Sequence, residues 1–185
     1  ISIGAIEVID GRVVLSSAFE VVFRQPEASA NANILIHGID GTTQLAGLEP
    51  AEASLQFLGF IEDAPLVGFH ADFDRVMINR ANKEAIGCTI SNHWLDLAYL
   101  APALLSESGQ AQPQGLDAWM ARTGITNQLR HNALADALAT AQLLQVVLAP
   151  GAWLGQLPLP DLARVAAIRA PGSEIAASWL HLMAL

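Results

Sequence analysis

A histidine and an aspartate stand five residues apart in this sequence, His131 and Asp136, ahead of an apolar-rich run. On one continuous α-helix this spacing would separate the two side chains by about 140° around the axis. They can converge only if His131 lies in the loop before a helix and Asp136 lies in its first turns, with Asn132 as the N-cap residue. The pair would then place an imidazole that titrates near neutral pH beside a hard oxygen ligand for a divalent cation. The same spacing also suits an exposed histidine followed by an aspartate that favours the positive end of a helix.

A second acidic segment contains Asp72 and Asp74, directly after an apolar run at residues 65–69. This run predicts a buried strand, and residues 71–85 predict a helix. Because open α/β sheets place their ligand sites at the carboxyl ends of strands, we expect one of the two aspartates to point into such a crevice. Both could instead be N-terminal helix residues that complement the helix dipole.

Turn signals and hydrophobic periodicity predict the elements that would position these residues. Residues 1–9 and 12–23 flank Asp10-Gly11, so they predict a β-hairpin. Pro50 predicts the first position of a helix. The core-facing residues of that helix are expected at helical spacing, namely Ala51, Leu55, Leu58 and Ile61. A final strand is expected at residues 92–97, and further helices at residues 97–105, 115–122, 133–148, 162–168 and 174–182. Strands followed by alternating strands and helices indicate an α/β or mixed α+β sheet.

The composition is that of a globular chain, with 185 residues, 52% of them hydrophobic and 15% charged, which suits one domain. The net charge of −9 argues against a wide duplex-binding surface, since a polyanion would be repelled unless metal ions or a local patch reversed the field. The single cysteine, Cys88, excludes an internal disulfide framework and fits a reducing compartment. No apolar run has the length of a membrane span. We therefore expect a cytoplasmic protein without membrane association.

Three segments, in this order and spacing, resemble the motifs of the DnaQ-like, DEDDh-type 3′–5′ exonucleases: His37-Gly38-Ile39, residues 66–74 and residues 131–136. This family includes the proofreading epsilon subunit of bacterial DNA polymerase III and free-standing relatives. The resemblance spans residues 1–148 and implies a ribonuclease H-like α/β fold, in which a mixed β-sheet is flanked by helices. We expect an exonuclease domain over residues 1–149, and a C-terminal helical extension over residues 150–185 that packs on the same domain.

The resemblance implies roles for the matched residues in catalysis and metal binding. Asp74 and Asp136 would be metal ligands, and His131 would be the general base toward the attacking water. Phe73 would be a core residue behind Asp74. We expect Asp96 to be structural, as the cap of the helix that begins after it.

The resemblance also implies how the substrate would be held. His37-Gly38-Ile39 would hold the 3′-terminal nucleotide by stacking and main-chain contact. His70 stands where the family commonly has Asn, and we include it among the substrate-binding residues.

Phosphodiester hydrolysis explains why carboxylates and a histidine would be used together. The reaction needs an attacking hydroxide, stabilisation of a pentacoordinate phosphate and relief for the leaving 3′-oxygen, which two divalent cations roughly 3.5–4 Å apart can provide. Mg²⁺ and Mn²⁺ prefer carboxylate and water oxygens. The expected cofactors are therefore two divalent cations, Mg²⁺ or Mn²⁺.

One motif of the family is absent, the Asp-x-Glu of its first strand, which should precede Ile1 by about one hairpin. Neither Glu7, on the neighbouring strand, nor Asp10, in the hairpin turn, is expected to replace it. In the family that strand lies in the middle of the sheet, between the strand at Ile1 and the one at Leu66. Its absence would leave main-chain donors and acceptors unpaired, so we expect the natural protein to contain it upstream.

These features together predict a metal-dependent 3′–5′ exonuclease that acts on single-stranded nucleic-acid 3′ ends, DNA rather than RNA, in proofreading or repair. A DNA polymerase or repair complex is the candidate partner. The alternative is a non-catalytic module on the same fold that binds nucleic-acid ends or a protein. A third reading is a metal-dependent phosphohydrolase that acts on mononucleotides.

Overall fold

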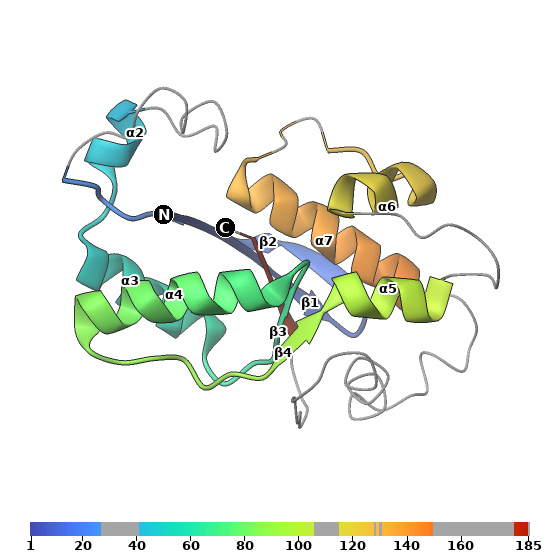
Figure 1. Cartoon of the computed structure of the whole chain (residues 1–185), viewed down its shortest axis with the longest axis horizontal. Coiled ribbons are helices and arrows are strands. Elements are labelled where there is room, and N and C mark those ends of the chain that lie inside the picture. Colours follow the sequence, from blue (N-terminus) through green and yellow to red (C-terminus); the bar gives the residue numbers. More distant parts are fainter. Residues whose placement is uncertain (27–40, 106–114, 128, 130, 150–179, 185) are drawn as a thin grey trace.

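A mixed β-sheet with helices packed on both faces forms the molecule (Figure 1). This computed structural model describes residues 1–26, 41–105, 115–127, 129, 131–149 and 180–184. The predicted α/β class is confirmed, and the architecture is the one expected of a ribonuclease H-like fold.

The first two strands form the predicted hairpin. β1 (Ser2–Ile9) pairs antiparallel with β2 (Arg12–Val22). Asp10 and Gly11 both have positive φ, 51° and 73°, as a tight hairpin turn that matches the twist of its strands requires. The sequence therefore specifies this turn locally.

The remaining strands are short and come from distant parts of the chain. β3 (Leu66–Gly68) pairs parallel with β4 (Trp94–Asp96), and β5 (Leu180–Ala184) lies between β3 and β1. β5 runs parallel to β3 and antiparallel to β1, so that the strand order is β2-β1-β5-β3-β4. β5 therefore joins the hairpin to the parallel pair.

β5 corrects two expectations. The helix predicted over residues 174–182 is wrong at its end, because residues 180–184 form a strand; residues 174–179 lie outside the described part. We also expected the position between β1 and β3 to lack a strand in this sequence. β5 occupies it, pairs with both neighbours and satisfies their main-chain hydrogen-bonding groups. This pairing is a tertiary interaction that local helical periodicity does not report. The β5 sequence, Leu-His-Leu-Met-Ala, contains no Asp or Glu.

Among the described residues, α3 (Pro50–Ile61) and α4 (Ala71–Ile86) pack on one face of the sheet (Figure 1). On the other face lie α5 (Leu97–Leu105), α6 (Gly115–Thr123) and α7 (Ala133–Leu148). These five helices lie where the sequence predicts them; the short α2 (Gly41–Ala46) was not predicted. The predicted helix at residues 162–168 and both Trp-containing segments near residues 153 and 179 lie outside the described residues.

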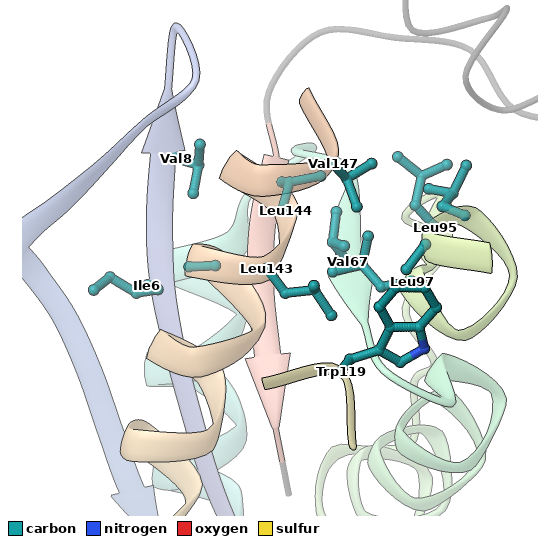
Figure 2. Close-up of a cluster of buried hydrophobic side chains, with 12 residues drawn as sticks. Ile6, Val8, Val67, Leu95, Leu97, Trp119, Leu143, Leu144 and Val147 are labelled. Atoms are coloured by element: carbon teal, nitrogen blue, oxygen red, sulfur yellow. The ribbon is translucent and has the colours of Figure 1, made fainter. Parts of the chain in front are cut away.

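Alternation along β1 divides the core into two clusters. Ile6 and Val8 face α7, whereas Ile3 and Ala5 face α3 and α4, as the two-residue period of a strand requires. Figure 2 shows the first cluster, in which side chains from three strands meet Trp119 and α7. β1 and β3 are thus buried on both faces, which accounts for their apolar sequences, whereas the edge strand β2 is mostly exposed or half-buried.

The orientation of α3 agrees only in part with the expected one: Ile61 is buried and Leu58 packs against the core, as predicted, but the other two predicted core residues are exposed. Leu55 is 62% exposed and Ala51 is also exposed, whereas Ala53, Phe57 and Ile61 are buried. The helix has apolar residues on more than one stripe, and Phe57 packs against Phe19 of β2, with ring centroids 6.1 Å apart. Contact with the hairpin, rather than periodicity alone, decides which stripe is buried.

Within the described residues, no helix is both long enough and apolar enough to cross a membrane.

Candidate active site

The Asp74 carboxylate lies in the first turn of α4, close to the end of β3. Asp74 is only 6% exposed. A Cβ added to Gly68 would lie 2.8 Å from Asp74 Oδ2, so the missing side chain of Gly68 leaves the space that the carboxylate occupies. Of the two predicted aspartates, Asp74 is buried and Asp72 is exposed, where it forms an ion pair with Arg75.

Asp96 holds the start of α4 from the neighbouring strand. Its Oδ1 accepts hydrogen bonds from the main-chain N–H of His70 (2.9 Å) and of Ala98 (2.8 Å), and its Oδ2 accepts one from Ala71 (3.1 Å). The bond from Ala98 confirms the predicted cap of α5. The two other bonds are an additional role, because the side chain of His70, the N-cap residue of α4, makes no capping bond of its own.

Burial makes Asp74 electrostatically unusual. Loss of solvent, followed by the nearby charge of Asp96, raises the pKa of Asp74 to about 7. Burial also raises the pKa of Asp96, but its main-chain hydrogen bonds oppose that change. Within the described part of the chain, no hydrogen bond or ion pair reaches the Asp74 carboxylate. A buried, unpaired carboxylate of this kind is chemically suited to bind a cation, which would favour its charged form.

His131 and Asp136 adopt the arrangement that the sequence predicts. Asn132 is the N-cap of α7, and its side chain accepts a hydrogen bond from Ala135 N (2.9 Å). His131 precedes the helix with φ 68°, and its main-chain N–H donates to Asp136 Oδ2 (3.2 Å). His131 is exposed and Asp136 is half-buried. The loop and the first turn of α7 therefore converge on one carboxylate.

A further contact to Asp136 was not predicted. Asn127 donates from Nδ2 to Asp136 Oδ1 (2.7 Å). An asparagine nine residues before an aspartate carries no local signal, since the two meet only because the loop folds back on α7.

The sheet brings the two acidic segments to the same end. The start of α7 crosses β1 at Gly4, where an added Cβ would lie 2.2 Å from the main-chain carbon of Ala133. Gly4 pairs with Ala184 at the carboxyl end of β5. β3 runs parallel to β5 and pairs Leu66 with His181 and Val67 with Leu182, so that Gly68 follows toward the same end. Asp74, beside Gly68, and the start of α7 thus lie on the two sides of that end.

Glu7 and Asp10 lie elsewhere, as expected. Glu7 pairs with His181, which in turn pairs with Leu66 at the opposite end of β3, and Asp10 lies in the hairpin turn. Glu7 also lines a cavity of about 640 Å³ between the hairpin and the end of α3. That cavity is therefore separate from Asp74 and His131.

The remaining predicted site residues differ in outcome. His37-Gly38-Ile39 lie outside the described residues. His70 is exposed, has φ 65°, and contacts Phe69 edge-on. Phe73 is not a core residue: it is 63% exposed, because consecutive helical residues point about 100° apart and the neighbouring Asp74 takes the inward direction.

In the described part of the chain, no three His, Cys, Asp or Glu residues are placed to hold a metal ion together. Asp74 and Asp136 supply carboxylates on either side of β5, and β5 itself supplies none. The residues present therefore suit cation binding individually but do not form a complete ligand set.

Comparisons with known proteins agree on one family. Residues 1–144 match the family model described as Exonuclease. A DNA polymerase III subunit epsilon-like protein of Rhodobacter capsulatus is 31% identical over 144 residues, 77% of this chain and 20% of that relative. DNA polymerase III PolC-type proteins of Thermotoga petrophila and Thermotoga maritima are each 27% identical over 143 residues, 77% of this chain and 10% of each relative. The chain thus spans a fifth or less of the length of these relatives.

Proposed function

Because the chain belongs to the exonuclease family, as its DnaQ-like motifs predict, we propose that it is a metal-dependent 3′–5′ exonuclease domain acting on single-stranded 3′ ends. The observation that supports the proposal is that Gly68, beside Asp74, and the start of α7 lie on the two sides of the carboxyl end of β5, although Asp74 and His131 are 57 positions apart in sequence. Open α/β sheets bind their ligands at such an end.

Each residue has a distinct part in the proposed reaction. His131 is exposed, so its ring is accessible to the attacking water and would act as the general base. Asp74 and Asp136 would hold divalent cations, Mg²⁺ or Mn²⁺, which when bound stabilise the negative charge that develops on the phosphate and on the leaving oxygen. Members of this family generally depend on divalent metals, and a cation beside these acids would also reverse the local repulsion of a nucleic acid by a chain of net charge −9.

The exposed ring of Phe73 suggests how the substrate would lie. Phe73 immediately precedes Asp74 and is 63% exposed, so its face is available to stack against a base near the scissile phosphate. A base on a stacking platform must be unpaired, which supports a single-stranded substrate. His37-Gly38-Ile39 and His70 remain proposed contacts to the terminal nucleotide.

The choice of DNA, and of a DNA polymerase or repair complex as partner, follows the names of the relatives, which are DNA polymerase III proteins or resemble its epsilon subunit. A cytoplasmic location is proposed on the same ground.

The test is Mn²⁺-dependent digestion of a 3′-labelled single-stranded oligonucleotide, after intact-mass measurement and N-terminal sequencing of the protein used. Stepwise release of labelled mononucleotides, abolished by Asp74→Ala and unaffected by the exposed-surface change Arg80→Ala, supports the proposal. Digestion of mononucleotides but not of oligonucleotides would indicate a phosphohydrolase instead.

One observation favours a second candidate, a non-catalytic module that binds nucleic-acid ends or a protein. The central strand β5, which lies between the two acidic segments, contains no Asp or Glu. If the folded protein binds the oligonucleotide without trimming it, and binds it equally well after Asp74→Ala, the result would support the binding module and contradict the exonuclease.

A further inference from the structure

The side chain of Asn127 joins two parts of the segment that follows α6. Its Nδ2 donates to Asp136 Oδ1 (2.7 Å), and its Oδ1 accepts a hydrogen bond from Leu129 N (3.0 Å). Asn127 is half-buried. Both ends of one amide are therefore used, one toward α7 and one toward the loop itself.

The same loop reaches Asp136 a second time through His131. The main-chain N–H of His131 donates to Asp136 Oδ2 (3.2 Å), and Asn132 N donates to Leu129 O (3.0 Å). His131 holds φ 68°, a conformation that costs free energy for a residue other than glycine. Contacts with other residues are therefore needed to hold the main chain of His131 in this conformation. The hydrogen bond between Asn127 and Asp136 is one such contact, because it ties the segment before His131 to α7.

We propose that Asn127 is a positioning residue, which holds the loop of His131 against α7 and orients the Asp136 carboxylate. The inference rests on the proposed function, in which His131 is the general base and Asp136 a metal ligand. The bond is short and its acceptor is a carboxylate, so it belongs to the stronger class of hydrogen bonds. A neutral amide suits this place, because a lysine or arginine would bring a fixed positive charge to the carboxylate that is to bind a cation.

Two substitutions separate the two bonds of Asn127. Asn127→Ala removes both. Asn127→Asp keeps an oxygen that can accept from Leu129 N but loses the donor to Asp136. A matched control is Asn79→Ala, since the Asn79 side chain also binds a main-chain N–H, that of Ile90 (2.8 Å), but on α4 and outside this loop.

The first measurement is amide hydrogen exchange of the metal-free full chain by NMR. We expect exchange at His131 to be about five- to tenfold faster in both Asn127 variants and unchanged in Asn79→Ala. Leu129 should lose protection only in Asn127→Ala. Unchanged exchange at His131 in both variants would overturn the proposal.

The second measurement is the Mn²⁺ affinity of the full chain by isothermal titration, with thermal unfolding in parallel. Loss of a residue that orients a metal ligand lowers affinity by about 10- to 100-fold, so Asn127→Ala should weaken Mn²⁺ binding by this amount. Asn79→Ala should lower Tm without changing Mn²⁺ affinity. If Asn127→Ala leaves Mn²⁺ affinity unchanged while Asp136→Ala abolishes binding, the positioning role of Asn127 is refuted and the metal-ligand role of Asp136 is retained. If Asp136→Ala also leaves Mn²⁺ affinity unchanged, the metal-ligand role in the proposed function fails, and Asn127 is left without a ligand to position.

Discussion

The two acidic regions of the site are built in opposite ways. Asp74 lies in the first turn of α4, the helix that connects β3 to β4. It is 6% exposed and receives no hydrogen bond from the described residues. Asp136 is half-buried beside a loop, and its two oxygens accept hydrogen bonds from Asn127 and His131. Packing positions the first carboxylate and hydrogen bonds position the second. A charge held by packing alone destabilises the fold until a cation arrives, whereas a charge held by hydrogen bonds helps to order the chain around it.

The largest expected effect is on turnover, where the two carboxylates should behave alike. Asp74→Asn and Asp136→Asn should each lower the rate of 3′ trimming by about 10³-fold or more, because each removes a ligand of cations that contribute several kcal/mol to the transition state. His131→Ala should cost about 10²- to 10⁴-fold, as expected for a general base. The measurement is single-turnover trimming of a labelled oligonucleotide. A loss for one carboxylate only would show that the two regions do not share one site.

Stability should separate the two carboxylates. The pKa of Asp74 is about 7 in the folded protein and 3.8 in the reference state, so the folded chain binds more protons between these values and stability falls as pH rises from about 4 to 7. Asp74→Asn, which stays neutral, should remove this decline and raise the free energy of unfolding at pH 8 by up to about 4 kcal/mol. Asp136→Asn should instead lower stability. Urea unfolding at pH 4 and pH 8 in the presence of EDTA checks both, and a pH-independent effect of Asp74→Asn would contradict the burial argument.

Asp96 has two separate effects: it accepts main-chain hydrogen bonds at the start of α4, and its charge raises the pKa of Asp74. Asp96→Asn keeps one oxygen but loses one acceptor for the main chain at the start of α4, and should lower the free energy of unfolding by about 1–3 kcal/mol at pH 8. It should also lower the pKa of Asp74, because the charge that opposes ionisation of Asp74 is removed. Carboxyl ¹³C titration by NMR measures the second effect. An unchanged pKa of Asp74 would leave burial as its only cause.

The smallest expected effect belongs to Phe73. Phe73→Ala should raise KM for oligonucleotides about five- to tenfold, within the range for loss of one base-stacking contact. It should change the free energy of unfolding by less than about 0.5 kcal/mol, because the ring is largely exposed. Leu55→Ala, which truncates an exposed apolar residue on α3, is the control and should leave KM unchanged. Equal KM values for the Phe73 variant and the parent would remove Phe73 from the proposed substrate contacts.

Local sequence signals predicted much of the site's framework. The Asp10-Gly11 turn, Pro50 at the start of α3, and Asn132 at the start of α7 are decided by main-chain preferences of a few residues, and each is found as expected. The layout of His131 before α7 and Asp136 within its first turn follows from the same kind of signal. The roles of these residues in catalysis and metal binding remain predictions.

Predictions that depended on packing direction were less successful. The exposure of Phe73 and Leu55 could not be read from helical spacing, because a helix with apolar residues on several sides can bury any of them. The additional contacts of Asp96 join residues 26 and 25 positions apart, and that of Asn127 joins residues 9 positions apart, and no local pattern marks them.

The amino-acid sequence by itself determined the β1–β2 hairpin, β3, β4, the helices α3 to α7 and the family, because turns, caps and motif spacing act over a few residues. The tertiary structure alone decided that residues 180–184 form the strand between β1 and β3, and that Asp74 and Asp136 lie on either side of its end. The reason is physical: strand pairing and burial are set by partners that are remote in sequence, and their free energy can override local preference. The same partners bury Asp74 rather than Asp72, and this burial raises the pKa of Asp74.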